Sequence, residues 1–128
     1  WTNNTTTLAT FYSWVSNAPE GIWTDGTNLF GASYNPTGGG GSTIVFKVKL
    51  STGSMIGWQG NVGTQPTGGD SGCSSTSANT PTPGWCQGGY GAVGYTLGKF
   101  SNVSFVSGDA NFIYISDEGN HRVTRLPK

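Results

Sequence analysis

The sequence contains the same arrangement of short apolar segments twice. Residues 21–35, GIWTDGTNLFGASYN, align with residues 103–118, VSFVSGDANFIYISDE. In each copy an apolar run leads into a polar turn, DGTN or GDAN, and a second apolar run follows. A third run, VFKV at 45–48 or VTRL at 123–126, carries a basic residue at its third position. Because repeated units bury their apolar surface against one another, this self-similarity constrains the fold more than any single motif.

The repeated runs have the pattern of β-strands. Residues 43–50, TIVFKVKL, place Phe46 and Val48 on one face and Lys47 and Lys49 on the other, where we expect water to solvate the lysines. No window shows apolar residues at helical spacing behind a capping signal. The pattern predicts an all-β protein with strands at residues 8–15, 21–25, 29–33, 43–50, 54–59, 95–100, 103–107, 112–116 and 122–126.

The repeated unit is an antiparallel sheet. In the first copy a fourth run, SMIGWQG at 54–60, follows the turn STG, whereas the second copy contains three runs. The first copy is longer because PTGGGG, at 36–41, lies between its second and third runs. Four-stranded antiparallel sheets that repeat in tandem form the blades of β-propellers.

The second copy resembles the NHL repeat. FIYISDEGNHRVTRL, at 112–126, has its apolar strand, Asp, polar turn, Asn-His-Arg and apolar-x-basic strand. PEGIWTDGTNLF (19–30) is similar to the opening of such a repeat, and STGSMIGWQG (51–60) to its closing strand. TGGDSGCSSTSANTPTPGWCQGG (67–89) resembles a Cys-bearing loop of large bacterial, apparently secreted NHL proteins.

The resemblance implies blade-like repeats of propeller type within one all-β domain. Copy 1 spans about 19–60, the insert 61–94 and copy 2 about 101–126, with a further strand at 8–15. The first copy departs from the family after Ser33, where a Gly-rich stretch replaces Asn-His-Arg. We therefore expect a corner of different shape there.

The turn between 117 and 122 has two interpretations. In the structural one, Asp117 accepts backbone N–H bonds of the turn, Gly119 or Asn120 supplies a positive φ, and His121 and Arg122 begin the next strand. In the catalytic one, His121 is a general base or metal ligand beside Asp117. Zinc needs three or four ligands, more than this turn offers. We therefore favour the structural role and expect no catalytic residue, no metal and no cofactor.

The two cysteines are predicted to form a disulfide. Cys73 and Cys86 flank a segment rich in Ser, Thr, Asn and Pro that has little apolar surface to bury. Metal binding would require more ligands, and a redox-active pair would be closer in sequence. Cross-linking a loop of about 15 residues stabilises a fold by roughly 3 kcal/mol, but only in an oxidising compartment. The pair therefore predicts an extracellular or cell-surface protein.

Charge and composition exclude several partners. The chain of 128 residues has six basic and six acidic residues, so it lacks the basic excess that nucleic acids select. No apolar stretch is long enough for membrane insertion. Five tryptophans suggest glycans as a further partner, because exposed indoles stack on sugars. We expect Trp23 and Trp58 to pack between sheets. Trp85 is the better candidate for an exposed contact, but we expect it to pack on the disulfide.

The number of strands raises a packing problem that points to function. Two sheets cannot close a propeller, and an open pair leaves an exposed edge. We expect neighbouring repeats of a longer chain, or a homo-oligomer, or completion of the second sheet by residues 8–15. That segment would add a strand, in the same chain or in a neighbouring copy, through Leu8, Phe11, Tyr12 and Trp14.

The sequence leaves one leading function class and two alternatives. The first is a non-enzymatic extracellular structural or interaction module that self-associates, for example as a surface filament. The alternatives are a fragment of a metal-dependent propeller enzyme, a lyase or hydrolase, and a carbohydrate-binding surface domain.

Overall fold

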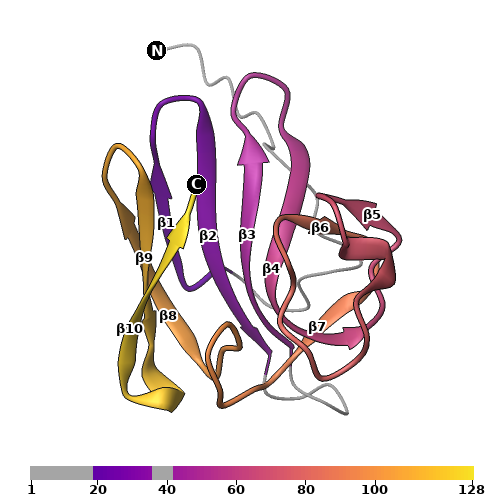
Figure 1. Cartoon of the computed structure of the whole chain (residues 1–128). Helices are drawn as coiled ribbons and strands as arrows, with labels where there is room; N and C mark the ends of the chain where they lie inside the picture. Colours follow the sequence, from indigo (N-terminus) through magenta and orange to yellow (C-terminus); the bar gives the residue numbers. More distant parts are fainter. Residues whose placement is uncertain (1–18, 36–41) are drawn as a thin grey trace.

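The computed structural model describes residues 19–35 and 42–128, and in these residues the fold is all-β and antiparallel, as predicted (Figure 1). The larger sheet, called the N-terminal sheet below, has the strand order β1-β2-β3-β4-β6-β5, and β7 pairs with β4. Its strands are β1 (Gly21–Thr24), β2 (Asn28–Asn35), β3 (Ser42–Lys49), β4 (Ser54–Thr64), β5 (Gly68–Gly69), β6 (Cys86–Gln87) and β7 (Tyr90–Ala92).

The smaller sheet, called the C-terminal sheet below, has the order β10-β9-β8. It consists of β8 (Val103–Gly108), β9 (Phe112–Asp117) and β10 (Arg122–Pro127), and the short 3₁₀ turn η2 (Glu118–Asn120) joins the last two. A second such turn, η1 (Cys73–Ser75), lies in the insert. Figure 1 shows that the β1–β2 and β8–β9 turns lie at the same end of the molecule.

The expected strand at 95–100 is wrong. These residues form a loop, in which the Lys99 backbone N–H donates to the Thr96 carbonyl (3.2 Å) and Gly98 has a φ of +77°. A positive φ of this kind bends the chain out of an extended strand. The insert contains instead the short strands β5, β6 and β7, which the sequence pattern did not indicate.

Two further expectations fall on residues that the structure does not describe. One is the strand at 8–15, and the other is the corner of different shape, which falls on residues 36–41.

The two sheets enclose the first of two apolar cores. The N-terminal sheet contributes Phe30, Ala32 and Val45, and the C-terminal sheet contributes the fully or almost fully buried Val103, Val106, Ile113 and Ile115. Strands β1 and β8 come very close together, since a Cβ placed on Gly21 of β1 would lie 3.0 Å from the Cα of Phe105 on β8. Glycine at 21 therefore permits the sheets to stack at this edge.

The two lysines on one face of β3 differ in exposure: Lys49 is exposed to water, as we expected, whereas Lys47 is only partly exposed. The Lys47 ammonium lies 5.6 Å from the Phe30 ring centroid and 5.4 Å from that of Trp85. The Lys47 side chain lies beside the core between the sheets, where the aromatic rings attract its positive charge. Alternation identified which residues share a face, but the face with lysines became an internal one.

The second core lies on the opposite face of the N-terminal sheet. Ile44, Phe46, Val48 and Trp58 are buried there together with the disulfide-bonded cysteines. The ring of Phe46 lies over Gly31, so that any side chain at 31 would collide with it. The N-terminal sheet is therefore apolar on both faces, as a central layer must be.

Candidate functional site

The Asp117 corner joins β9 to β10 and is built around a buried carboxylate. Asp117 is fully buried at the end of β9. Its Oδ1 accepts a hydrogen bond from the Ser101 backbone N–H (2.8 Å). Its Oδ2 accepts from Asn120 Nδ2 (2.8 Å) and from Arg122 Nε (2.9 Å). A buried carboxylate needs such partners, because removing it from water is costly otherwise.

Arg122 and Asn120 extend this network to the loop before β8. Two carbonyl oxygens, of Thr96 (2.9 Å) and Lys99 (2.6 Å), accept hydrogen bonds from one terminal nitrogen of Arg122. Asn120 Nδ2 also donates to the Gly94 carbonyl (3.0 Å). The corner therefore fastens residues 94–101 to the C-terminal sheet, through hydrogen bonds that span 16 to 26 residues of chain.

The backbone of the corner differs in detail from our expectation. Asp117 accepts a backbone N–H from outside the turn, not from within it. The positive φ belongs to His121 (φ 52°, ψ 42°), not to Gly119 or Asn120. Gly119 is needed for a different reason, since a Cβ there would collide with the carbonyl oxygen of Ser101. Hydrogen bonding, close packing and backbone conformation thus account for Asp117, Gly119 and His121 at this corner.

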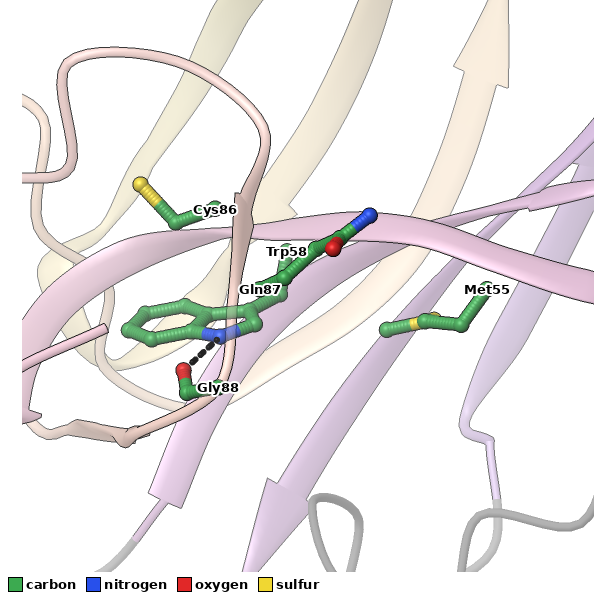
Figure 2. A pocket seen from close by; sticks show the side chains of 5 residues that line it. All are labelled: Met55, Trp58, Cys86, Gln87 and Gly88. Carbon is green, nitrogen blue, oxygen red and sulfur yellow. Dashed lines mark hydrogen bonds between the residues drawn. The ribbon is translucent and has the colours of Figure 1, made fainter. Parts of the chain in front are cut away.

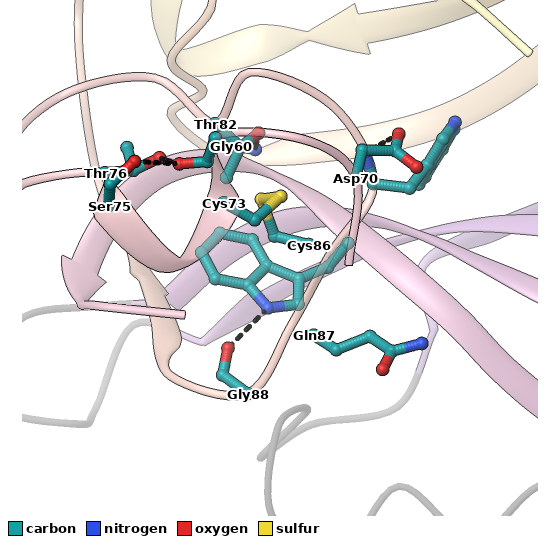
Figure 3. Close-up of a disulfide and its surroundings, with 12 residues drawn as sticks. Gly60, Asp70, Cys73, Ser75, Thr76, Thr82, Cys86, Gln87 and Gly88 are labelled. Carbon is teal, nitrogen blue, oxygen red and sulfur yellow. Dashed lines mark hydrogen bonds between the residues drawn. A yellow bond between two sulfur atoms is a disulfide. The ribbon is translucent and has the colours of Figure 1, made fainter. Parts of the chain in front are cut away.

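The predicted disulfide between Cys73 and Cys86 is present (Figure 3). Their Cα atoms are 5.4 Å apart and both residues are fully buried. The bond connects η1 to β6, and β6 pairs with β4 through Trp58 and Cys86. The insert is therefore anchored on the N-terminal sheet, with the sulfur atoms beside Trp58 in the second core.

Asp70 makes a second connection within the insert, to the backbone of Trp85, the residue before Cys86. Its Oδ2 accepts from the Trp85 backbone N–H (2.8 Å), and the Asp70 N–H donates to the Trp85 carbonyl (3.1 Å). Trp85 is 6 % exposed and its ring lies 5.8 Å from that of Phe30, in the core between the sheets. Trp85 is thus not an exposed contact for a sugar.

A small apolar hollow of about 200 Å³ lies beside Trp58 (Figure 2). Met55, Cys86, Gln87 and Gly88 also line it, and the Trp58 indole N–H donates to the Gly88 carbonyl (3.1 Å). The indole is 1 % exposed, so it is a wall of the hollow and not a free stacking surface.

The outer face of the C-terminal sheet, which points away from the N-terminal sheet, carries large exposed apolar side chains. Phe105 on β8 is 62 % exposed and Val123 on β10 is 71 % exposed. Both pair in register with Ser116 of β9, so the three residues form a row across the sheet.

A second row on the same face consists of Ser107, Tyr114 and Arg125, which lie next to one another in register. Tyr114 lies next to Arg125 in register, and the Arg125 guanidinium lies 4.3 Å from the Phe112 ring centroid. The Tyr114 hydroxyl donates to Asp109 Oδ2 (2.7 Å). This bond, together with two backbone N–H bonds, lowers the pKa of Asp109 to about 2, and it raises the pKa of Tyr114 above its usual 10.0.

Residues 19–35 and 42–128 contain no cluster of three or more His, Cys, Asp or Glu side chains that could hold a metal. Nor does this part of the chain contain a helix of sufficient length and apolarity to cross a membrane. Comparisons with family models, with curated proteins and with solved structures found no match for this chain.

Proposed function

We propose that this chain is a non-enzymatic extracellular structural or interaction module, which self-associates at a cell surface, for example into a filament. On this proposal its sheets are NHL-like blades of propeller type. The supporting geometry is the face-to-face packing of the two sheets on one apolar core.

The outer face of the C-terminal sheet is the observation that carries the proposal. Phe105 on β8 and Val123 on β10 are more than half exposed there, and no described strand pairs with the outer edge of β10. Exposed apolar side chains beside an open edge are a template for association, which single soluble domains avoid. Another copy of the chain, or a neighbouring repeat in a longer chain, would cover both features.

The corner and the disulfide support the structural part of the proposal. Asp117, Asn120 and Arg122 direct their polar atoms at one another and at backbone carbonyls. His121 serves the turn by its backbone conformation. The buried disulfide supports an oxidising, extracellular environment, where such a bond persists.

Strand donation is the route of association that we propose for the open edge. Leu8, Phe11, Tyr12 and Trp14, which lie outside the described residues, would supply the fourth strand to β10 of a neighbouring copy. A Tyr12→Pro variant should weaken association, because proline removes a backbone donor from the added strand. A Tyr12→Phe variant is the matched control and should associate like the parent.

Light scattering on the purified 128-residue chain tests the proposed function. We expect a mass well above the 13.3 kDa of one chain at micromolar concentration. A well-folded monomer under these conditions would refute self-association. Elemental analysis of the same sample addresses the enzyme alternative, because stoichiometric zinc or calcium would favour a metal-dependent activity instead.

A further inference from the structure

Two buried side-chain oxygens on neighbouring strands of the N-terminal sheet lack a protein partner. Thr43 of β3 is 0 % exposed, and Asn61 of β4 is 2 % exposed. Within residues 19–35 and 42–128, neither the Thr43 hydroxyl nor the Asn61 Oδ1 has a hydrogen-bond partner. Nearly all buried polar atoms in folded proteins bond to protein or to ordered water, because an unpaired one is costly. These two oxygens therefore indicate a further binding partner inside the chain.

The strand register places the two side chains next to each other. Ile44 of β3 pairs with Gly60 of β4, and Thr43 and Asn61 are the next residues along these two strands. A Cβ on Gly91 would lie 3.4 Å from the Thr43 carbonyl oxygen and 3.5 Å from that of Asn61, so the two residues stay close there. Side chains at opposite positions of an antiparallel pair have Cβ atoms about 4.5–5.5 Å apart. The two oxygens are thus neighbours that do not bond each other.

The pair lies at the junction between the two sheets. Val45, two positions after Thr43, is buried in the core between the sheets. Side chains two positions apart on a strand share a face, and so do opposite residues of a pair, so Thr43 and Asn61 face this core. Asn61 Nδ2 donates to the Val93 carbonyl (2.9 Å), directly before the loop that the Asp117 corner fastens to the C-terminal sheet.

The donors and acceptors of the pair match a water molecule. A threonine hydroxyl can donate or accept, whereas an amide oxygen only accepts. Because Asn61 Nδ2 donates to a carbonyl, the orientation of its amide is fixed and Oδ1 is the atom that remains. A water molecule can donate to Oδ1 and bond the hydroxyl at the same time. A cation such as calcium takes about six to eight oxygen ligands, mostly carboxylates, and this pair brings none.

We propose that Thr43 and Asn61 bind a buried water molecule, which bridges the Thr43 hydroxyl and the Asn61 Oδ1. The bridge joins β3 to Asn61 and, through Nδ2, to the Val93 carbonyl. Asn120 of the corner donates to the next carbonyl, that of Gly94 (3.0 Å). The two sheets thus hold consecutive residues of one segment, and the water completes the connection from the N-terminal side. This inference is independent of the proposed self-association.

Two substitutions at Thr43 test for the water directly. Thr43→Val removes the hydroxyl at nearly constant shape, and Thr43→Ser keeps the hydroxyl. Oxygen-17 relaxation dispersion of the solvent, measured on the 128-residue chain, counts the water molecules that the protein holds for long times. We expect Thr43→Ser to hold as many as the parent and Thr43→Val to hold one fewer. Thr124→Val makes the same change at a half-buried position of β10 and is the matched control, which should equal the parent.

The sign of the change in the thermal midpoint is a second test. If the water bridges the pair, Thr43→Val leaves the buried Asn61 Oδ1 without its partner, and the midpoint should fall by about 3–6 °C. If instead the hydroxyl has no partner at all, replacing it by a methyl group should raise the midpoint or leave it unchanged. A midpoint that rises or stays the same would therefore overturn the proposal. A midpoint that falls while the number of bound waters is unchanged would overturn it as well.

A high-resolution crystal structure of the parent decides the case if Thr43→Val does not fold. A water molecule within hydrogen-bond distance of both oxygens supports the proposal. A direct bond between the hydroxyl and Oδ1, or an apolar contact there, contradicts it. A chelator separates water from a metal ion, since a parent midpoint that falls on chelation, with no such fall for Thr43→Val, would show that the pair binds a cation instead.

Discussion

Removal of the Asp117 carboxylate should destabilise the fold strongly, because it is fully buried and has three hydrogen-bond donors. Asp117→Ala leaves the Ser101 N–H, a buried donor, without an acceptor, which costs about 1–3 kcal/mol. It also leaves the Arg122 guanidinium without its carboxylate. Breaking a buried ion pair from one side costs about 3–5 kcal/mol.

The surroundings of Arg122 place the expected loss of stability at the lower end of the range of about 3–5 kcal/mol. The Arg122 side chain is 24 % exposed and keeps two carbonyl acceptors, so its charge stays partly solvated and partly bonded. We therefore expect Asp117→Ala to lower the free energy of unfolding by about 3 kcal/mol. Asp117→Asn retains one acceptor oxygen and should lose less.

Urea unfolding, followed by tryptophan fluorescence, measures this loss. The slope with denaturant should be unchanged, so that the shift of the midpoint reports stability alone. Asp25→Ala is the control, because Asp25 accepts backbone N–H bonds in an exposed turn. A loss below 0.5 kcal/mol for Asp117→Ala, on the order of a neutral surface substitution, would refute the structural interpretation of the corner. A loss of binding at unchanged stability would favour a catalytic or ligand-contacting role instead.

Three further predictions concern the insert, the outer face and the turn. Replacing both Cys73 and Cys86 by serine should lower the free energy of unfolding, measured by urea unfolding, by about 3 kcal/mol. Free thiols in the unfolded, unreduced parent would contradict the disulfide. The Asp109 carboxyl, followed by carbon NMR, should titrate near pH 2, because the hydrogen bond from the Tyr114 hydroxyl lowers its pKa. The stability that this shift contributes to the fold is present above pH 3.8 and is lost as the pH falls through about 2. Tyr114→Phe should raise the titration midpoint of Asp109. His121→Gly should keep or raise the thermal midpoint, since glycine adopts a positive φ without strain, whereas a loss comparable to Asp117→Ala would show that the imidazole itself is needed.

The all-β fold and the disulfide could be predicted from the sequence because they depend on local or pairwise information. Alternation with period two identifies strands and groups the residues that share a face, as in β3. Polar turns such as DGTN separate such strands wherever they occur. Two cysteines in a segment with little apolar surface have few other uses. A polar turn at residues 117–122 was likewise visible, but its details were not, because Asp117 accepts a backbone N–H from outside the turn and the positive φ belongs to His121.

Which face is internal was decided by the tertiary structure. Lys47 was expected in water and lies between aromatic rings, because the second sheet packs on the lysine-bearing face. Aligning the second apolar runs, LFGAS and FIYIS, by sequence matches Leu29 with Phe112. The turns that begin at Asp25 and Asp109 have the same hydrogen bonds, and counting from them matches Leu29 with Ile113 instead. A shift of one residue moves every side chain of a strand to the other face, so this difference reverses the relative orientation of the sheets.

The acceptors of the corner also depended on the fold. The sequence singled out Asp117 and Arg122 but did not pair them. The acceptors of Arg122 at 96 and 99 come from a loop that the pattern had assigned as a strand, and Ser101, which donates to Asp117, follows that loop. The positive φ at His121 follows from the same constraint, since the chain must bring Gly119 against Ser101 before β10 begins. Local sequence determined the strands and turns of this protein, because hydrogen bonding and side-chain alternation act over a few residues. Tertiary packing, of one sheet on the other and of the insert on the N-terminal sheet, determined which residues are buried and which remain exposed.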